Sequence, residues 1–273
     1  MALLVLATLF TGCVGNGGET IPTPTTVQSI SVTGSTTVLP IAQKAAESYM
    51  DAHAYADIQV SGGGSGAGVQ AVGEGTADIG MASRDLKAAE KEKYPDLVQY
   101  VVARDGIAVI VNPAVAVNAL TTEQIKAIYT GETKNWKELG GSDMTIVVIG
   151  RDSSSGTREF FSEKVMEKAD YVSTQLEKNS NGAVKQTVAQ TPGAIGYVGL
   201  GYLDATVKAL KIDENGKSVD PSIETVTSGE YPIARTLNMF TKGEASGLSK
   251  DYLDYILSPA GQKIVEEEGF VSA

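Results

Sequence analysis

Short apolar segments alternate with longer amphipathic segments from Ile30 to the C-terminus, and no other feature of the sequence limits the fold so strongly. The short apolar segments predict strands, and they cover residues 30–33, 58–60, 78–81, 106–111, 145–149, 194–198 and 233–240. The amphipathic segments predict helices, and they cover residues 38–50, 69–72, 120–129, 160–169 and 252–268. Strands that alternate with helices predict an α/β fold, in which helices cover both faces of a parallel or mixed sheet.

Three of the turns between a strand and the next helix are rich in glycine, serine and threonine: residues 34–37, 62–68 and 151–157. Each turn would place hydroxyl groups beside the unpaired N–H groups of a helix N-terminus, which carries about half a positive charge and binds anions. Arg151 adds a full positive charge in a planar group that matches tetrahedral oxyanions. Serine and threonine are also ordinary helix caps. The recurrence of the pattern, together with Arg151, therefore predicts an oxyanion site.

Charge and residue content exclude several other classes of protein. The formal net charge of −11 argues against binding to nucleic acid. It does not exclude an anion site, because exposed charges are largely screened beyond about 8 Å at physiological salt. Cys13 is the only cysteine and His53 the only histidine, so neither a zinc site built from these residues nor a disulfide within the chain is expected. We expect no metal and no cofactor. His53 lies where a helix should end, which favours an exposed side chain over a catalytic base.

The first 13 residues indicate the compartment. Residues 1–10 form an apolar run that is too short to span a bilayer, which takes about 20 residues. The run is followed by Thr11-Gly12-Cys13, an ending similar to a lipoprotein signal in which Cys13 would carry the lipid. Residues 14–28 are rich in Gly, Thr and Pro and predict an extended tether, with folded protein from Ser29. A buried N-terminal strand with an inert cysteine is the alternative. The first interpretation places the protein on the extracytoplasmic face of the membrane, held by lipid only, or in a periplasm.

The order and spacing of the motifs resemble those of the phosphate-binding proteins of ABC phosphate importers. That family has the type II periplasmic-binding fold, and the resemblance runs from about Ser31 to the C-terminus. The segments that carry it are 33–37, 64–68, 77–80, 128–131, 135–136, 151–158, 190–197 and 258–261.

This resemblance implies two lobes with the ligand in a cleft between them. Lobe I would comprise residues 29–108 and 233–273, and lobe II residues 109–232. The chain would cross between the lobes near Ala108 and near Ile233. The resemblance further implies a monomeric binding protein without enzymatic activity, which hands inorganic phosphate to the membrane subunits of an ABC importer.

The resemblance also implies which residues contact phosphate. From lobe I these are Thr36, Thr37 and Ser65, and from lobe II they are Arg151, Ser155, Gly156 and Thr157. Asp152 would brace Arg151.

One position departs from the family pattern. Many relatives carry an aspartate that accepts the proton of hydrogen phosphate, and Ser83 stands there in this chain. Three interpretations remain open. The Ser83 hydroxyl takes the place of the aspartate, the Asp85 side chain turns toward the ligand instead, or the protein discriminates less strictly between phosphate and other oxyanions. Arg84 is either a second cation near the site or a surface residue.

Alternative functions follow from the same residues. The site could take another tetrahedral oxyanion, such as sulfate or molybdate. A phosphohydrolase using Ser65 or Ser155 is disfavoured, because the sequence shows neither a metal cluster nor a base near either serine. A purely adhesive or scaffold lipoprotein would not need Arg151 beside a Ser-Gly-Thr turn.

Overall fold

The computed structural model describes residues 26–273. The strands are β1 Gln28–Gly34, β2 Ala56–Gly62, β3 Ile79–Ala82, β4 Leu97–Val111, β5 Ala119–Thr121, β6 Val147–Arg151, β7 Leu176–Lys178, β8 Ala194–Gly199, β9 Lys208–Ala209, β10 Lys211–Glu214, β11 Lys217–Val219 and β12 Ala234–Lys242. The helices are α1 Leu39–Ala52, α2 Ser65–Glu74, α3 Ala88–Lys93, α4 Thr122–Thr130, α5 Gly156–Lys164, α6 Asn181–Gln190, α7 Ile223–Thr227, α8 Gly247–Leu257 and α9 Pro259–Glu267. No described helix is long and apolar enough to cross a bilayer.

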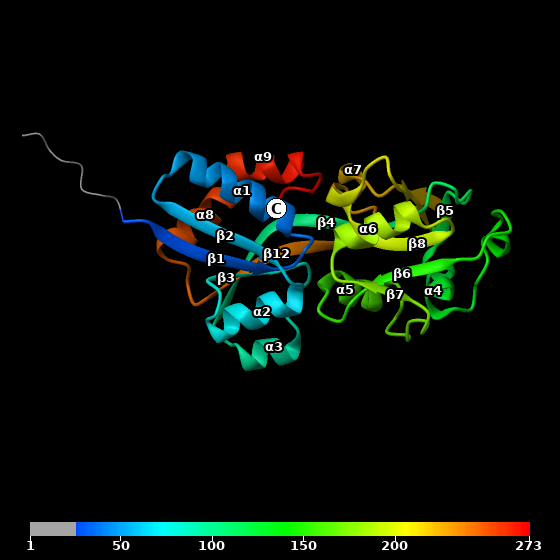
Figure 1. Cartoon of the computed structure of the whole chain (residues 1–273), viewed down its shortest axis with the longest axis horizontal. Coiled ribbons are helices and arrows are strands. Elements are labelled where there is room, and N and C mark those ends of the chain that lie inside the picture. Colours follow the sequence, from blue (N-terminus) through cyan, green and yellow to red (C-terminus); the bar gives the residue numbers. More distant parts are fainter. Residues whose placement is uncertain (1–25) are drawn as a thin grey trace, which may run out of the picture.

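Most strands belong to one long mixed sheet with the order β2-β1-β3-β12-β4-β8-β6-β7. Strand β4 joins its two halves, because it changes partner along its length. From Leu97 to Gly106 it pairs antiparallel with β12, and from Ile107 to Val111 it pairs antiparallel with β8. Strand β12 in turn pairs with β3. Two strands, β4 and β12, therefore connect the two halves of the molecule (Figure 1).

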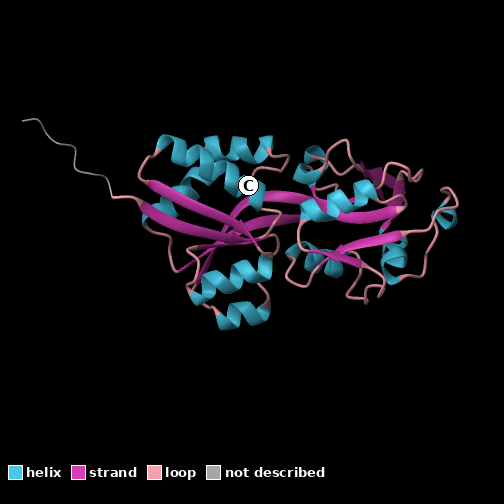
Figure 2. Ribbon diagram, in the orientation of Figure 1, coloured by secondary structure: helices cyan, strands magenta, loops and turns pink. Residues whose placement is uncertain are grey.

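Each half has its own hydrophobic core, which defines two lobes. Lobe I contains β1–β3, α1–α3, α8 and α9, and its core includes Val32, Ile41 and Tyr252. Lobe II contains β5–β11 and α4–α7, and its core includes Trp136 and Phe161. Helices cover both faces of the sheet in lobe I (Figure 2). The predicted two-lobed α/β fold is confirmed.

The limits predicted for the lobes and the N-terminal segments stay predictions. The partner change in β4, between Gly106 and Ile107, lies close to the crossing expected near Ala108. The signal at residues 1–13, including Cys13, and most of the tether at 14–28 lie outside the described residues. Regular structure already begins at Gln28, inside the end of the segment predicted as tether.

Several element boundaries predicted from the sequence are wrong. Helix α2 begins at Ser65 rather than Val69, so part of the glycine-rich turn is already helical. Strand β4 starts at Leu97, nine residues before the predicted 106–111. The single helix predicted over 252–268 is two helices, α8 and α9. Proline has no N–H for a continuing helix, and Pro259 instead opens α9 behind the capping residue Ser258.

Candidate oxyanion-binding site

Four helix N-termini meet where the two lobes touch. Helices α1 and α2 in lobe I and α5 in lobe II begin at the three turns singled out in the sequence. Helix α6 of lobe II begins beside them, with Ser180 as its cap. All four helices are nine residues or longer, so each supplies unpaired N–H groups and a partial positive charge.

Hydroxyl groups of lobe I contact lobe II directly at this point. The Oγ1 atoms of Thr37 and Thr157 lie 3.0 Å apart. The Asn181 amide Nδ2 donates to Thr37 Oγ1 at 3.0 Å and to Thr36 Oγ1 at 3.1 Å. All four side chains are buried. The start of α1 is therefore joined to the starts of α5 and α6 by hydrogen bonds between side chains.

A second cross-lobe contact involves the two serines of lobe I. The backbone N–H of Ser83 donates to Ser65 Oγ at 3.0 Å, and the two hydroxyl oxygens lie 3.3 Å apart. Gly156 of lobe II packs against this pair. A methyl group added to Gly156 would lie 2.2 Å from Ser65 Oγ and 3.0 Å from Ser83 Oγ. Only glycine therefore permits this approach. Ser155, the cap of α5, is buried next to Gly156 and accepts from the N–H of Arg158.

The Arg151 side chain is buried at the end of β6, which agrees with a role inside the protein rather than on its surface. Its guanidinium donates to the carbonyl oxygens of Lys178 and Asn179, at 3.1 and 3.2 Å. Burial lowers the pKa of Arg151, and the negative charge of nearby Asp152 opposes this shift.

No hydrogen bond or ion pair joins Asp152 to Arg151 among the described residues, although the negative charge of Asp152 acts to raise the pKa of Arg151. The carboxylate of Asp152 accepts hydrogen bonds from the backbone N–H and the hydroxyl of Ser154, at 2.9 and 2.5 Å. Asp152 instead shapes the turn before α5. Ser154 then reaches lobe I, because its carbonyl accepts from the N–H of Gly66 at 3.0 Å.

A buried ion pair on the two crossing strands was missed in the sequence. Asp105 of β4 accepts from Arg235 of β12, with the Oδ2 atom 3.0 Å from Nε and 2.7 Å from Nη2. Arg235 also donates to Thr37 Oγ1 at 3.3 Å and to the carbonyl of Ser83 at 3.0 Å. Burial raises the pKa of Asp105 and lowers that of Arg235, and the charge of each partner opposes both shifts. The pair thus ties the crossing strands to the site.

The sequence contains features by which three further residues of the site could be recognised: Asn181, Asp105 and Arg235. Ser180-Asn181-Gly182 is another polar turn before a helix, and it matches the other three in composition. Asp105 directly precedes the predicted strand 106–111, and Arg235 lies within the predicted strand 233–240. A charge on a buried strand needs a partner, so each residue indicates a buried counter-charge, but the sequence does not show which residue supplies it.

The two neighbours of Ser83 face away from the site. The Arg84 guanidinium bonds to Glu90 at 2.7 and 2.8 Å, and its Nε lies 2.7 Å from Glu159 of lobe II. Asp85 is exposed and accepts from the Gln99 amide at 3.4 Å. Arg84 thus takes part in a cross-lobe ion pair, and the Asp85 carboxylate contacts Gln99 in this structure.

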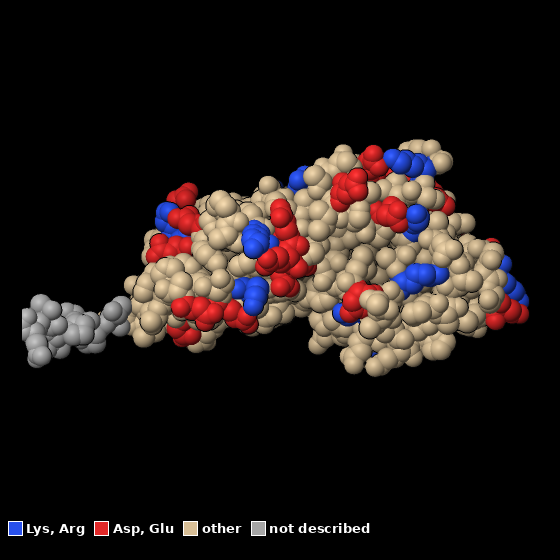
Figure 3. All heavy atoms as spheres, turned by 90° about the horizontal axis from the view of Figure 1, so that it is seen from above, with Lys and Arg blue, Asp and Glu red and all other residues tan. Residues whose placement is uncertain are grey.

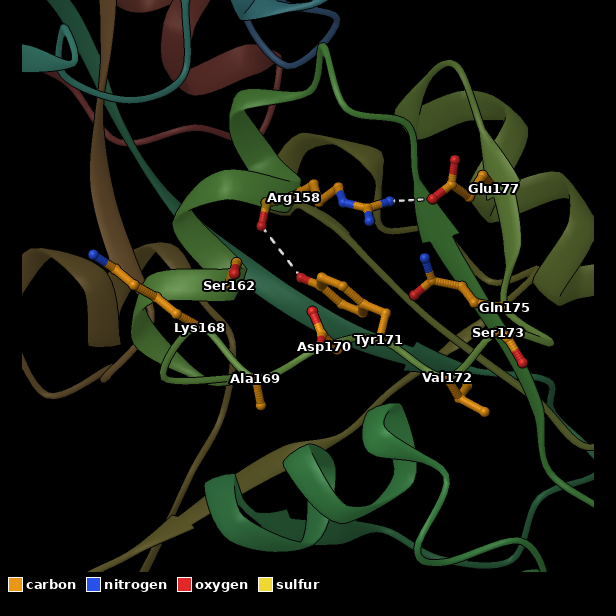
Figure 4. A pocket seen from close by; sticks show the side chains of 10 residues that line it. All are labelled: Arg158, Ser162, Lys168, Ala169, Asp170, Tyr171, Val172, Ser173, Gln175 and Glu177. Carbon is orange, nitrogen blue, oxygen red and sulfur yellow. Dashed lines mark hydrogen bonds and ion pairs between the residues drawn. The ribbon is translucent and has the colours of Figure 1, made fainter. Parts of the chain in front are cut away.

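Cavities open on both sides of α5. One of about 440 Å³ lies between the lobes and is lined by residues 84–87, 159–160, 163–164 and 234–236. Another, of about 550 Å³, lies within lobe II (Figure 4). There Arg158 pairs with Glu177, and its guanidinium lies 4.6 Å from the centre of the Tyr171 ring. Arg158 is the residue of segment 151–158 that lines this second cavity, and its positive charge is already paired with Glu177.

The positive charge of the site is internal. Acidic and basic side chains are interspersed over both lobes on the face shown in Figure 3. Arg151 and Arg235 are both buried, whereas the net charge of −11 is spread over the whole chain. A local anion site is thus compatible with an acidic protein.

Two lobes joined by a pair of strands, with polar groups of both lobes meeting between them, define the class of two-lobed solute-binding proteins. The family model of the PBP superfamily domain matches residues 20–260. The chain is 43% identical over 247 residues to the phosphate-binding protein PstS of Bacillus subtilis strain 168, covering 89% of this chain and 80% of that protein. It is 32% identical to PstS of Staphylococcus epidermidis RP62A, covering 99% and 87%. The chain belongs to the PstS family of the PBP superfamily.

Solved structures agree with this assignment. A putative phosphate ABC transporter substrate-binding protein from Clostridium perfringens, solved with bound phosphate, is 38% identical with a TM-score of 0.84. The match covers 90% of this chain and all of that one. An ABC-type phosphate transport receptor from Vibrio cholerae is 32% identical with a TM-score of 0.74, covering 89% of this chain and 100% of its own.

Proposed function

We propose that this protein captures inorganic phosphate outside the cytoplasm and delivers it to the membrane subunits of an ABC importer. The ligand would lie between the lobes, where four helix N-termini and the hydroxyls of both lobes converge; this convergence is the observation that carries the proposal. The proposed ligand contacts are Thr36, Thr37, Ser65, Ser83, Arg151, Ser155, Gly156 and Thr157. The PstS relatives and the C. perfringens structure support phosphate as the ligand.

The chemistry of these groups suits a buried oxyanion. A charged ligand is expensive to bury unless hydrogen-bond donors surround it. Helix N–H groups and hydroxyls supply such donors without adding net charge, and Arg151 supplies one cation. Hydroxyls of lobe I already lie within 3.0 Å of lobe II, so closure of the lobes would shield the ligand from water.

Binding without catalysis is part of this proposal. Ser65 and Ser155 accept hydrogen bonds from backbone N–H groups, which do not activate a hydroxyl as a nucleophile. His53 follows the C-terminal end of α1, whereas Thr36 and Thr37 precede its start. A 14-residue helix is about 20 Å long, so the imidazole is out of reach of the site.

We further propose that Cys13 carries a lipid that holds a monomeric protein at the membrane. The apolar run before Cys13 and the Gly/Thr/Pro-rich segment after it support this anchor. Mass analysis of the membrane-bound protein tests it. A terminus at a diacylated Cys13 is expected, and an unmodified terminus at Met1 would overturn the anchor.

Isothermal titration with phosphate tests the site. One phosphate per chain is expected, with an affinity of about micromolar or better, roughly −8 kcal/mol. Arg151→Ala should lose about 3–5 kcal/mol, since it removes the cation of a buried site. Arg104→Ala is the control, because that guanidinium bonds to the carbonyl of Ser272 in lobe I. Equal binding by the Arg151 variant would reject the site, and tighter binding of sulfate or molybdate would reject phosphate as the ligand.

A further inference from the structure

The backbone carbonyl of Thr36, just before α1, is left without a helical partner by the sequence. The N–H of Leu39 donates to the carbonyl of Ser35 at 3.1 Å, and the next bond of this series would join Pro40 to Thr36. Proline has no N–H to donate. The hydroxyl of Tyr202 in lobe II donates to the Thr36 carbonyl instead, so the vacant bond is made between the lobes. Burial raises the pKa of Tyr202 to about 12, so this hydroxyl keeps its proton at neutral pH.

Tyr202 lies in a short 3₁₀-helix, η2 Leu200–Tyr202, which follows β8 in lobe II. The N–H of Leu200 donates to Asp105 Oδ1 on the crossing strand β4 at 2.9 Å. The next residue, Gly201, packs against the segment that follows α9 in lobe I. Tyr202 then reaches the start of α1. Each residue of η2 therefore contacts lobe I or the strand that crosses between the lobes.

The contact of Gly201 is close enough to require glycine. A methyl group added to Gly201 would lie 2.4 Å from the carbonyl oxygen of Glu268 and 2.3 Å from a ring carbon of Phe270. The oxygen belongs to the backbone, so no change of rotamer can move it aside. A methyl group added to Gly269, on the other side of the contact, would lie 3.2 Å from the Cα atom of Gly201. Any larger residue at position 201 would therefore hold η2 away from lobe I.

The segment after α9 is directed to Gly201 by its own local structure. Gly269 has a φ of +80°, a left-handed conformation that commonly ends a helix. The N–H groups of Gly269 and Phe270 donate to the carbonyls of Glu266 and Val265, both at 3.0 Å. These two bonds are typical of a Schellman motif. The chain thereby turns at the end of α9 and reaches toward lobe II (Figure 1).

Phe270 and Val271 are neighbours in the chain but belong to different cores. Phe270 lies in the core of lobe I, and Val271 lies in the core of lobe II. Val271 also forms a bridge with Arg104 of β4, through N–H···O bonds of 2.7 and 3.0 Å. Residues 268–271 therefore make a third link between the lobes, beside the crossing strands β4 and β12.

We propose that Gly201 and residues 268–271 are positioning elements that seat η2 on lobe I, so that Tyr202 reaches Thr36 and the closed lobes hold phosphate longer. This inference rests on the proposed function and concerns groups that are not among the proposed ligand contacts. Because the Tyr202 bond joins the two lobes at the start of α1, its strength adds to the interactions that keep the lobes together around phosphate. Release of phosphate should therefore depend on a contact outside the ligand site.

The test is phosphate release, measured by stopped flow, together with phosphate affinity from isothermal titration. Release from Tyr202→Phe should be about fivefold faster than from wild type, since this change removes one hydrogen bond between neutral groups. Release from Gly201→Ala should be at least about tenfold faster, because the methyl group overpacks the contact. Association should change by less than about twofold in both variants. Wild-type release rates in both variants would overturn the proposal.

The double variant separates positioning from an independent packing effect. If Gly201 acts through Tyr202, then Gly201→Ala already takes the tyrosine hydroxyl away from Thr36. Adding Tyr202→Phe to Gly201→Ala should then change release by less than about twofold, whereas independent effects would multiply. Multiplying effects would show that Gly201 does not position Tyr202.

Tyr252→Phe is the matched control. The Tyr252 hydroxyl also donates to a backbone carbonyl, that of Ala42 at 2.6 Å, but both partners lie in lobe I. This variant should have a lower melting temperature and wild-type release. If Gly201→Ala does not fold, the comparison of Tyr202→Phe with Tyr252→Phe decides, and equal release from these two would overturn the proposal. Wild type that binds no phosphate would instead reject the proposed function.

Discussion

The hydroxyl oxygens of Thr37 and Thr157 lie 3.0 Å apart, although 120 residues separate them and they belong to different lobes. Each follows a different strand and stands at the start of a different helix, α1 or α5. The two lobes therefore touch through the groups that we propose bind phosphate. Any change that keeps the lobes apart should weaken binding without disturbing either core.

The substitution Gly156→Ala should keep the lobes apart and so weaken phosphate binding. The added methyl group would lie 2.2 Å from Ser65 Oγ and 2.8 Å from Ser65 Cβ, so the lobes cannot approach as closely. Alanine is otherwise well suited to a helix, so stability should change by less than about 1 kcal/mol. Phosphate affinity should fall at least about tenfold in isothermal titration, since overpacking costs about 1–3 kcal/mol.

Gly182→Ala is the matched control. Gly182 lies in the first turn of α6, and a methyl group there would meet no atom within 4 Å. Its phosphate affinity should equal that of wild type. Equal losses in the two variants would show that glycine itself, rather than the approach of the lobes, matters at these positions.

Glu159→Gln should favour the open form. Glu159 of lobe II lies 2.7 Å from Arg84 and 2.9 Å from Lys87, both in lobe I, and its side chain is 25% exposed. Without this carboxylate the contact between the lobes loses two ion pairs, which should favour separation of the lobes. Phosphate should dissociate several times faster, and the difference should shrink at high salt as charges are screened. Stopped-flow measurement of release at low and high salt checks this.

Glu167→Gln serves as control, because the Glu167 ion pair with Lys126 lies wholly within lobe II. Release from this variant should match wild type at every salt concentration. Glu159→Gln with unchanged release at low salt would show that the ion pairs with Arg84 and Lys87 do not stabilise closure.

The sequence was sufficient for the fold and for finding the turns that meet between the lobes, for a physical reason. Glycine, serine and threonine gather in the turns before α1, α2 and α5 because these turns expose N–H groups and approach one another closely. That composition is local, so it can be read without the structure. The turn before α6, Ser180-Asn181-Gly182, is also polar but was not singled out, and its hydroxyl and amide groups reach the site only through the folding of lobe II.

The contacts of Asp105, Arg235 and Asp152 could not be read in the same way. The ion pair of Asp105 and Arg235 joins residues 130 positions apart, and it depends on the register of β4 against β12. The resemblance to the family implied that Asp152 braces Arg151, its neighbour in the sequence. The turn before α5 instead directs its carboxylate to Ser154. Sequence proximity does not determine the direction of a side chain.

The pH dependence of stability should change in Glu90→Gln. Burial would raise the pKa of Glu90, but hydrogen bonds from Arg84 and from the Lys87 N–H outweigh it, so the pKa is lowered. Because the folded pKa lies below the unfolded one, the stabilisation is complete above the ordinary value of 4.5 and is lost as the pH falls through the folded pKa. Denaturant unfolding from about pH 6 to pH 3 should therefore show a flatter curve for Glu90→Gln.

At neutral pH the same variant should be less stable by about 1–3 kcal/mol, since it weakens a bond to the buried Arg84. Glu92→Gln, an exposed position on the same helix, should follow the wild-type curve. A Glu90 variant whose curve has the wild-type slope would contradict the lowered pKa.

Ser83→Asp should sharpen the choice of phosphate over sulfate. Ser83 is 1% exposed and lies 3.3 Å from Ser65, so a carboxylate here would face the proposed ligand. Hydrogen phosphate can donate its proton to this carboxylate, whereas sulfate at neutral pH has no proton and would meet a negative charge. Competition titrations should show sulfate losing at least about tenfold more affinity than phosphate, because an unpaired charge against one ligand gives specificity. Asp85→Asn, which alters the exposed neighbouring carboxylate, should leave the ratio unchanged. Equal losses of sulfate and phosphate in Ser83→Asp would mean that residue 83 does not face the ligand.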